Sequence, residues 1–446
     1  MVRIIADLQI HSKYSRAVSS KMDLFHIAEW SEKKGINLTA VGDWTHPLWF
    51  KEIQKNLEEV RPGIFGFKQR VLREKNLIYG FKARFILSTE ISSIYKQADK
   101  VRRIHTLLIV PSLQSADKIR TEFINRGCNL FSDGRPIVGL TVQQIAEIVL
   151  EIEPKSLIVP AHIWTPHFSL FGSMSGFDSV SEAFGKYEKY VYAIETGLSS
   201  DPIMNWQIAD LDHRRILSFS DAHSGPKLGR EATFFLAKDY DSFDYFDLYK
   251  TIKGEPSNLK LSYTIEFFPE EGKYHLSGHR SCQIKLEPEE VKKHNGICPK
   301  CNKPLIIGVK DRVWNLASRV ITESDLEFRK NSNGVVFVRD KEGKRLPFVS
   351  LVPLLEVLEE VERSKTKAFA KYNLMLENFA DEFSILLDKS LSEISSFAGP
   401  VLAKAISNLR QRKVSLDAGY DGVFGKIKVL DQTDRETASE NQSGLF

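Results

Sequence analysis

Apolar residues in the first two-thirds of the chain fall into short runs that alternate with stretches of helical spacing. Ile4 and Ile5 begin the first strand-like run. Helical spacing covers residues 22–34, 115–125 and 141–150. Strand–helix alternation predicts a mainly parallel α/β sheet, open or closed into a barrel. The further predicted strands are 37–42, 85–90, 106–110, 157–160, 191–195 and 216–220.

The pattern changes after residue 266. Leu354, Leu355, Leu358 and Val361 recur at helical spacing, and residues 352–398 are predicted to be mostly helical. Residues 399–400, Gly-Pro, break that run, and a helix is predicted at 401–412. Its cationic end could contact DNA or simply complement the helix dipole. Residues 419–422 form a predicted turn that ends the folded part, and the polar segment from 431 is predicted to be disordered.

Composition excludes few classes of protein. The chain has 446 residues, 42% hydrophobic and 27% charged, which is ordinary for a soluble protein of two or three domains. The net charge of +4 neither requires nor excludes nucleic-acid binding. No apolar run is long enough to cross a membrane, and the N-terminus does not resemble a signal peptide. The expected location is cytoplasmic, in association with the nucleoid, without membrane contact.

Polar residues gather where the predicted strands end. Asp7, Gln9 and His11 alternate along one strand, so their side chains share a face. A lone histidine is most often a hydrogen-bonded structural residue, but functional groups of parallel α/β folds collect at the carboxyl ends of strands. Nitrogen and oxygen donors favour Zn, Mn or Fe. The sequence predicts a multi-metal site there, with further candidates Asp43, His46, Glu90, His105, His162, Asp221 and His223.

These motifs resemble the PHP (polymerase and histidinol phosphatase) phosphoesterase superfamily. The resemblance implies a distorted (β/α)7 barrel with two or three divalent ions (Zn, Mn or Mg) that hydrolyse phosphoesters. It implies that Glu90, Asp221 and His223 act in catalysis, and it leaves Asp43 and His46 as alternatives for one ligand position. The superfamily usually has histidine where this chain has Gln9, so one metal is expected to be weak, shifted or differently held unless the residue is an engineered inactivating change.

Longer motifs resemble the endonuclease Q branch of this superfamily. They span residues 42–47, 195–202 and 229–233. The resemblance covers nearly the whole chain and implies a DNA-repair endonuclease that cuts 5′ to uracil, hypoxanthine, xanthine or an abasic site. Trp44 and Trp164 are candidates for stacking on a base, with core packing as the alternative. Arg230 is a candidate phosphate contact, with a structural ion pair as the alternative.

A second metal site is predicted near residue 290. His279 and Cys282 precede Cys298 and Cys301, with 15 residues between the two pairs. This spacing is typical of a closed tetrahedral zinc site, which is structural because no position remains for water. His275 and His294 are alternatives to His279 with less suitable spacing. Nearby lysines could touch DNA phosphates or form a solvated face.

The predicted organisation has four parts: a phosphoesterase barrel (1–265), a zinc-binding module (266–311), a mainly helical region (312–426) and a tail (427–446). Gln442, Leu445 and Phe446 at the end of the tail resemble a sliding-clamp-binding motif. Two alternatives stay open beside a lesion-cutting nuclease, namely a small-molecule phosphatase similar to histidinol phosphatase, and a non-catalytic protein that binds damaged DNA.

Overall fold

The computed structural model describes residues 1–446 except 78–79, 98, 432–433 and 435–446. The barrel strands of its N-terminal half lie in one large sheet and in a separate parallel pair, β9 with β10. Parallel pairing joins β1 to β2 and β2 to β5, and an isolated parallel bridge from Ile10 to Ala222 brings the chain after the last strand back beside the first. The strands in order are β1 (Val2–Asp7), β2 (Leu38–Ala40), β5 (Arg84–Gln97), β6 (Lys100–Val110), β8 (Leu157–Pro160), β9 (Ala193–Glu195) and β10 (Arg215–Leu217).

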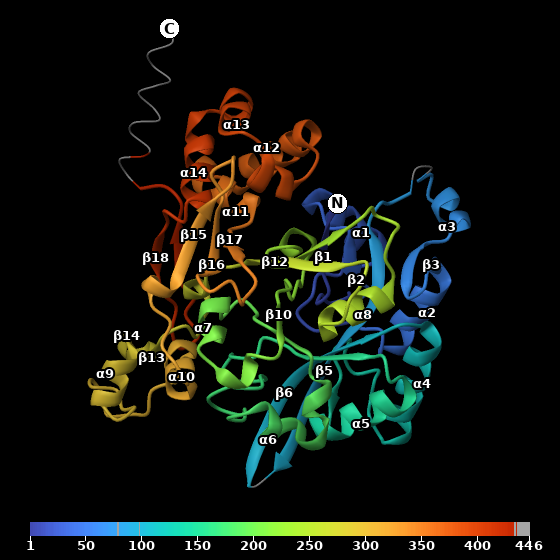
Figure 1. Ribbon diagram of the computed structural model, residues 1–446, viewed down its shortest axis with the longest axis horizontal. Helices are drawn as coiled ribbons and strands as arrows, with labels where there is room; N and C mark the ends of the chain where they lie inside the picture. The colour runs from blue at the N-terminus through green and yellow to red at the C-terminus, as the bar shows by residue number, and fades with distance from the viewer. Residues whose placement is uncertain (78–79, 98, 432–433, 435–446) are drawn as a thin grey trace.

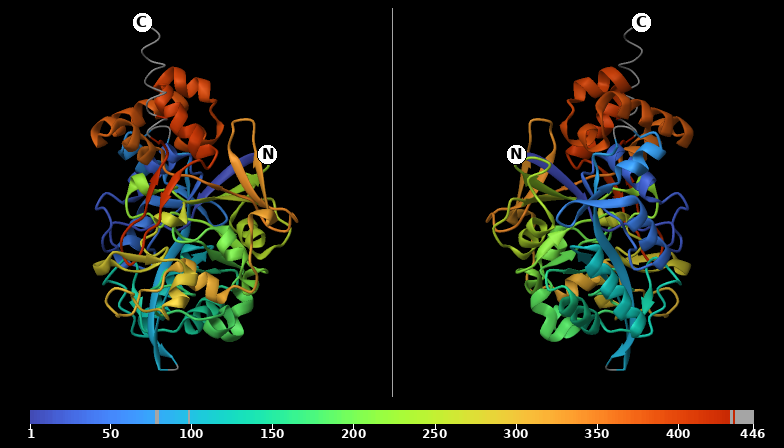
Figure 2. Two further views of the ribbon diagram at one scale, coloured as in Figure 1. Left: turned by 90° about the vertical axis from the view of Figure 1, so that its left-hand side faces the viewer. Right: turned by 90° about the vertical axis from the view of Figure 1, so that its right-hand side faces the viewer.

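One strand departs from the predicted parallel arrangement. β5 and β6 are longer than the sequence pattern indicated and form an antiparallel hairpin, and β6 pairs antiparallel with β8 as well. The hairpin projects from the end of the molecule opposite the C-terminal helices (Figure 2). Apolar periodicity reports burial and not direction, which is why the reversal was not predicted.

The predicted helices are confirmed to within a few residues. α1 (Leu24–Lys34) begins at Asp23, whose side chain accepts from the His26 N–H, and ends at Gly35 in the left-handed conformation. α4 (Leu113–Asn125) and α5 (Val142–Ile152) follow the two other helical stretches. Further helices are α2 (Pro47–Asn56), α3 (Gln69–Glu74), α6 (Val180–Phe184), α7 (Pro202–Trp206) and α8 (Tyr245–Lys253).

The main sheet continues beyond the barrel. β1 pairs antiparallel with β11 (Ala232–Ala237), and β11 pairs with β12 (Lys260–Glu266). β12 then pairs with β17 (Phe348–Ser350), so the sheet connects the two ends of the chain. The predicted class, a mixed α/β fold with a helical C-terminal region, is confirmed. The other strands are β3 (Leu57–Arg61), β4 (Ile64–Phe67), β7 (Ile137–Val138), β15 (Leu326–Lys330) and β16 (Val336–Asp340).

The late part of the chain contains a small module and a group of helices (Figure 1). The small module has β13 (Ser277–His279), β14 (Ile284–Leu286) and α9 (Pro288–Lys293), and α10 (Val309–Leu316) follows it in the chain. Beyond the predicted turn at 419–422 the chain adds β19 (Lys426–Lys428), paired with β18 (Ser415–Asp417). The helices are α11 (Leu354–Glu362), α12 (Lys365–Phe379), α13 (Leu391–Ala398) and α14 (Pro400–Arg410).

The cationic end of α14 faces inward. Arg410 is 1% exposed and donates to the carbonyls of Ile385, Leu386 and Lys389. Arg412 lies over the ring of Phe268. These arginines therefore bind the protein's own groups, and the suggested DNA contact at this helix end is not supported.

The structure describes only part of the predicted tail. Apart from Asp431 and Asp434, the segment predicted to be disordered lies outside the described residues, as do Gln442, Leu445 and Phe446 of the clamp-binding motif, so both stay predictions. None of the helices in the described part of the chain is long and apolar enough to cross a membrane.

A buried ion pair connects the barrel to the C-terminal helices. Lys34, at the end of α1, has a side chain 1% exposed, and its Nζ lies 2.7 Å from Glu382 Oε2. The Tyr372 hydroxyl donates to the same oxygen at 2.8 Å, and the Leu354 N–H donates to Oε1 at 3.0 Å. A buried carboxylate with this many partners depends on its cation.

Replacing Lys34 by Met should lower the free energy of unfolding by about 3–5 kcal/mol, because Glu382 would stay buried without its cation. The exposed pair of Lys33 with Glu29 offers a control, and Lys33→Met should change stability by less than about 1 kcal/mol. Denaturant unfolding measures both. Equal effects of the two substitutions would contradict the importance of the buried pair.

Candidate metal centre

Two groups of nitrogen and oxygen ligands adjoin at the end of the barrel where β1, β8 and β10 finish. In each group the candidate ligand atoms lie within 4.8 Å of one another. His11 connects them, because its Nε2 lies 3.0 Å from Asp221 Oδ1 and 3.5 Å from Glu90 Oε2. Imidazole and carboxylate donors suit divalent cations such as zinc and manganese. The groups are His11 with Asp221 and His223, and Glu90 with His105 and His162.

The first group is held by contact between the ends of β1 and β10. The His11 N–H donates to the Ala222 carbonyl at 3.0 Å, beside the bridge from Ile10 to Ala222. Asp221 and His223 flank Ala222 in sequence, so this contact brings both to His11.

The second group depends on the β5–β6 hairpin. Ser92 faces His105 across the ladder, and Glu90 faces Leu107, so Glu90 and His105 are diagonal neighbours on one face. Their side chains are in direct contact, with His105 Nδ1 against Glu90 Oε1. His162 follows β8, and its backbone N–H donates to the Glu195 carboxylate. Glu90 and His105 thus lie within long strands, not at the strand ends where the sequence placed them.

Three residues of the site have a left-handed backbone. The φ angles are +44° at Asp43, +30° at His162 and +47° at Asp221. Such angles are uncommon outside glycine and cost free energy that the surrounding structure has to offset. They occur here where the chain turns sharply after a strand and carries a functional side chain over the end of the barrel.

Asp43 orients His11. Its carboxylate lies 3.0 Å from His11 Nδ1 and accepts from the N–H and hydroxyl of Ser12 and from the Ser15 hydroxyl. Burial alone would raise the pKa of Asp43, but His11 and Ser12 together hold it below its ordinary value. A carboxylate on the far nitrogen of a ligating imidazole fixes its tautomer and orientation.

His46 takes a different position from the other candidates. It is the N-cap of α2, where its side chain accepts from the Trp49 N–H, and its ring stacks on Tyr14 at 4.4 Å. Within the described residues it belongs to neither ligand group. Of the two alternatives for one ligand position, Asp43 lies beside the groups and His46 caps a helix.

Asp7 and Gln9 form hydrogen bonds with residues that carry or adjoin the ligand groups. Asp7 accepts from the backbone N–H groups of Ser220 and Gly229, each at 3.0 Å, and so holds the segment that carries Asp221. Burial raises the pKa of Asp7 to about 6. The Gln9 amide donates to Glu90 Oε2 at 2.9 Å. Its own oxygen is buried and, within the described structure, has no hydrogen-bond partner, so it could accept a cation.

The three predicted DNA contacts are placed elsewhere. Trp44 and Trp164 are fully buried, and the Trp164 indole donates to Asn205, so neither ring has surface on which a base could stack. Arg230 donates to the carbonyls of Ser220 at 2.8 Å and Asp221 at 3.3 Å. It therefore braces the ligand-bearing segment through backbone carbonyls, whereas the predicted alternative to a phosphate contact was an ion pair.

Sequence reasoning missed Arg135, which lies between the two ligand groups. Its Nη1 is 3.5 Å from Glu90 Oε1 and 3.5 Å from His11 Nε2. It belongs to a loop with no strand or helix pattern, so nothing in the sequence placed it here. Phe168 also lies at the site, with its ring 4.9 Å from that of His105 and its side chain partly exposed.

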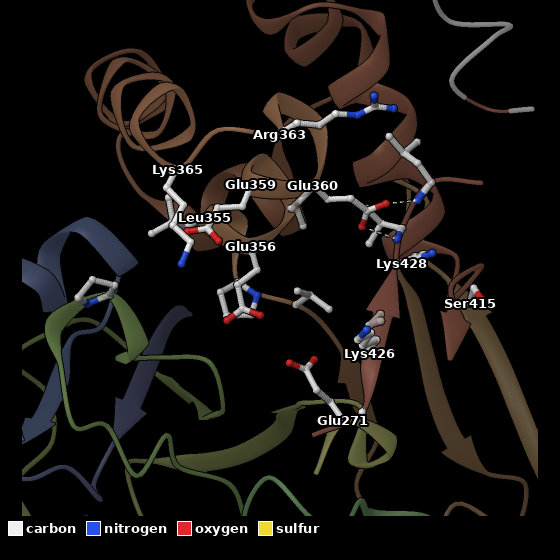
Figure 3. Close-up of a pocket in the computed structure, with 18 of the residues that line it drawn as sticks. Glu271, Leu355, Glu356, Glu359, Glu360, Arg363, Lys365, Ser415, Lys426 and Lys428 are labelled. Carbon is white, nitrogen blue, oxygen red and sulfur yellow. Dashed lines mark hydrogen bonds between the residues drawn. The ribbon is translucent and has the colours of Figure 1, made fainter. Parts of the chain in front are cut away.

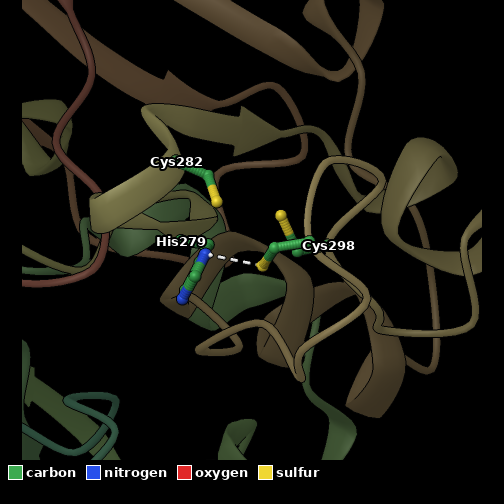
Figure 4. Close-up of side chains that lie close together, drawn as sticks. His279, Cys282 and Cys298 are labelled. Carbon is green, nitrogen blue, oxygen red and sulfur yellow. Dashed lines mark hydrogen bonds between the residues drawn. The ribbon is translucent and has the colours of Figure 1, made fainter.

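The predicted zinc ligands converge in the small module (Figure 4). His279 Nδ1 lies 3.4 Å from Cys301 Sγ, and the candidate atoms of all four residues lie within 4.8 Å of one another. One histidine and three thiols in a compact group suit a tetrahedral zinc ion. His275 is buried away from this group, and burial lowers its pKa to about 4. The set is His279, Cys282, Cys298 and Cys301.

A cavity of about 1160 Å³ lies between the barrel and α11 (Figure 3). Lys227, four residues beyond His223, forms a 2.6 Å ion pair with Glu356 of α11. Glu271 also lines the cavity, and burial raises its pKa to about 7. Basic and acidic residues are balanced in this lining, so its charge does not by itself favour a phosphate backbone.

Comparison with curated proteins gives two uncharacterised relatives. YqxK of Bacillus subtilis (strain 168) is 28% identical over 443 residues, covering 96% of this chain and 100% of the relative. MJ0043 of Methanocaldococcus jannaschii is 28% identical over 293 residues, which are 64% of this chain and 34% of the relative. No protein-family model matches the chain.

Solved structures give a more informative match. The lesion-specific endonuclease PfuEndoQ from Pyrococcus furiosus is 30% identical, with a TM-score of 0.80 over 100% of both chains. Endonuclease Q in complex with a 27-mer duplex substrate bearing an abasic lesion at its active site is also 30% identical, with a TM-score of 0.80 over 99% of this chain and 100% of that one. With this identity over the whole length of both chains, the protein belongs to the endonuclease Q family.

Proposed function

We propose that this protein is a metal-dependent DNA endonuclease that cuts the phosphodiester on the 5′ side of a damaged nucleotide. The observation that carries the proposal is the pair of adjoining ligand groups joined by His11 in a chain of the endonuclease Q family. The solved relatives are described as a lesion-specific endonuclease and as a complex with an abasic duplex. Uracil, hypoxanthine, xanthine and abasic sites are the proposed lesions.

The residues have separate roles in this proposal. Two divalent ions, when bound about 3.5–4 Å apart, would neutralise phosphoryl charge, activate water and stabilise the leaving oxygen. His11, Asp221 and His223 would hold one ion and Glu90, His105 and His162 the other. Asp43 orients His11, while Asp7 and Arg230 fix the backbone around Asp221.

Both alternatives are less well supported. A small-molecule phosphatase would not need the zinc module and the helical region that this family carries behind the barrel. A non-catalytic binding role rested on Gln9, yet each ligand group has three candidate ligands without that residue. The deciding experiment incubates the metal-loaded protein with end-labelled duplexes, each carrying one defined lesion, and with histidinol phosphate as the competing substrate. Turnover of the monoester alone would overturn the proposal.

Asp221→Asn and His223→Ala should each lower the cleavage rate by about a thousandfold or more, because each removes a proposed ligand of a catalytic ion. Single-turnover assays under excess metal measure the effect. Asp241→Asn and His213→Ala are matched controls at exposed positions and should leave the rate unchanged. Normal cleavage by either site variant would contradict the assignment of that residue.

Cys298→Ser combined with Cys301→Ser should remove one zinc ion per chain and unfold the small module, because structural zinc contributes free energy of folding directly. Elemental analysis gives the zinc content, and limited proteolysis reports the unfolding. Cys128→Ser is the control, since Cys128 lies outside the cluster. An unchanged zinc content in the double variant would rule out the site.

Gln9→His should strengthen or add one barrel ion, because the residue faces Glu90 and an imidazole is a better ligand than an amide. Metal content after dialysis at graded metal concentrations measures this. Gln54→His, at an exposed position, controls for adventitious binding by a new histidine. Identical binding curves for the wild-type protein and the Gln9 variant would place residue 9 outside the metal site.

A further inference from the structure

The loop that carries Arg135 is fixed against the barrel. The Asp133 carboxylate accepts from the N–H of Arg16 at 3.2 Å and from that of Arg135 at 3.1 Å. Between them, the Gly134 N–H donates to the Tyr14 carbonyl at 3.0 Å. These three hydrogen bonds of backbone N–H groups fix the backbone position from which the Arg135 side chain extends.

Gly134 shows how closely this loop approaches the ligand groups. A Cβ atom at this position would lie 2.4 Å from Asp43 Oδ2 and 2.4 Å from Ser15 Oγ. Any side chain would therefore displace the carboxylate that orients His11. The absence of a side chain lets the loop lie directly on Asp43, so the following residue reaches over the two ligand groups.

The Arg135 guanidinium makes only long polar contacts within the described part of the chain. Its 3.5 Å contacts with Glu90 and His11 are longer than a good charge-assisted hydrogen bond. Within the described part of the chain, its guanidinium makes no shorter polar contact, and its side chain is 24% exposed. Arg230, by contrast, donates to two carbonyls and braces the backbone.

We propose that Arg135 binds a non-bridging oxygen of the phosphodiester that is cut, which rests on the proposed endonuclease function. Glu90 and His11 are themselves proposed metal ligands, so neither is a lasting partner for the guanidinium. A planar guanidinium matches two oxygens of a phosphate and keeps its charge at every working pH. Held over the site by the loop, it stabilises the negative charge that develops on the phosphoryl oxygens.

A role confined to balancing the charge of Glu90 would have different consequences. Removal of Arg135 would then alter metal binding or lower stability, and the substrate's charge would not matter. A phosphate contact predicts the opposite: metal content and stability stay the same, and the loss depends on one oxygen of the substrate. The two roles are therefore separable by experiment.

The test is a double-mutant cycle between Arg135→Gln and a methylphosphonate, which replaces one charged oxygen by a methyl group, at the phosphate 5′ to an abasic site. Binding is measured by fluorescence anisotropy on the Asp221→Asn background, so that cleavage during the titration is negligible. We expect each change alone to weaken binding about tenfold and the two together to weaken it no further. Effects that multiply to about a hundredfold would overturn the proposal.

Controls separate this inference from the proposed function. Arg126→Gln, at an exposed arginine paired with Glu122, and a methylphosphonate several nucleotides away should both be neutral. Without the Asp221 change, Arg135→Gln should lower kcat/KM by about a hundredfold, with Arg135→Lys recovering part of it. Wild-type protein that cuts no damaged duplex would defeat the proposed function. Equal cutting by wild type and Arg135→Gln, or loss of barrel ions in the variant, would defeat only this inference.

Discussion

Carboxylates that are buried away from water are the constraint on which this structure depends. Asp7, Asp43 and Glu90 are each at most 2% exposed, and an isolated carboxylate in such a place is very costly. Each has its own set of partners. Backbone N–H groups donate to Asp7, Ser12 and His11 contact Asp43, and Gln9 and His105 contact Glu90. The end of the barrel is arranged around these partnerships.

The same requirement extends into the C-terminal part of the chain. Glu382 is buried with Lys34 of the barrel, and Glu356 pairs with Lys227 close to the segment that carries His223. The two pairs differ in their surroundings. The first is enclosed, whereas the second is partly exposed at the edge of a cavity and is correspondingly weak. These two ion pairs therefore hold the helical region unequally, strongly at Glu382 and weakly near the site.

Much of this was predictable from the sequence, because apolar runs and strand-following polar residues are local signals. The runs predicted the barrel strands, and the ligand types predicted a multi-metal site and a zinc cluster. What failed depended on long-range geometry. The direction of β6, the burial of Trp44 and Trp164 and the position of Arg135 are set by contacts between distant segments. Such contacts cannot be predicted from the identity and spacing of residues alone.

The left-handed backbone at Asp43, His162 and Asp221 has a consequence for how this site can change over time. At such angles asparagine, aspartate and glycine are tolerated, whereas β-branched residues are strongly disfavoured. Steric contacts within the backbone therefore limit which amino acids can occupy these positions, independently of metal binding. Exchange of Asp221 for asparagine keeps the turn and alters only charge, while exchange for valine would unsettle the turn too. The substitutions that the backbone tolerates at these positions therefore tend to keep the fold while they remove activity.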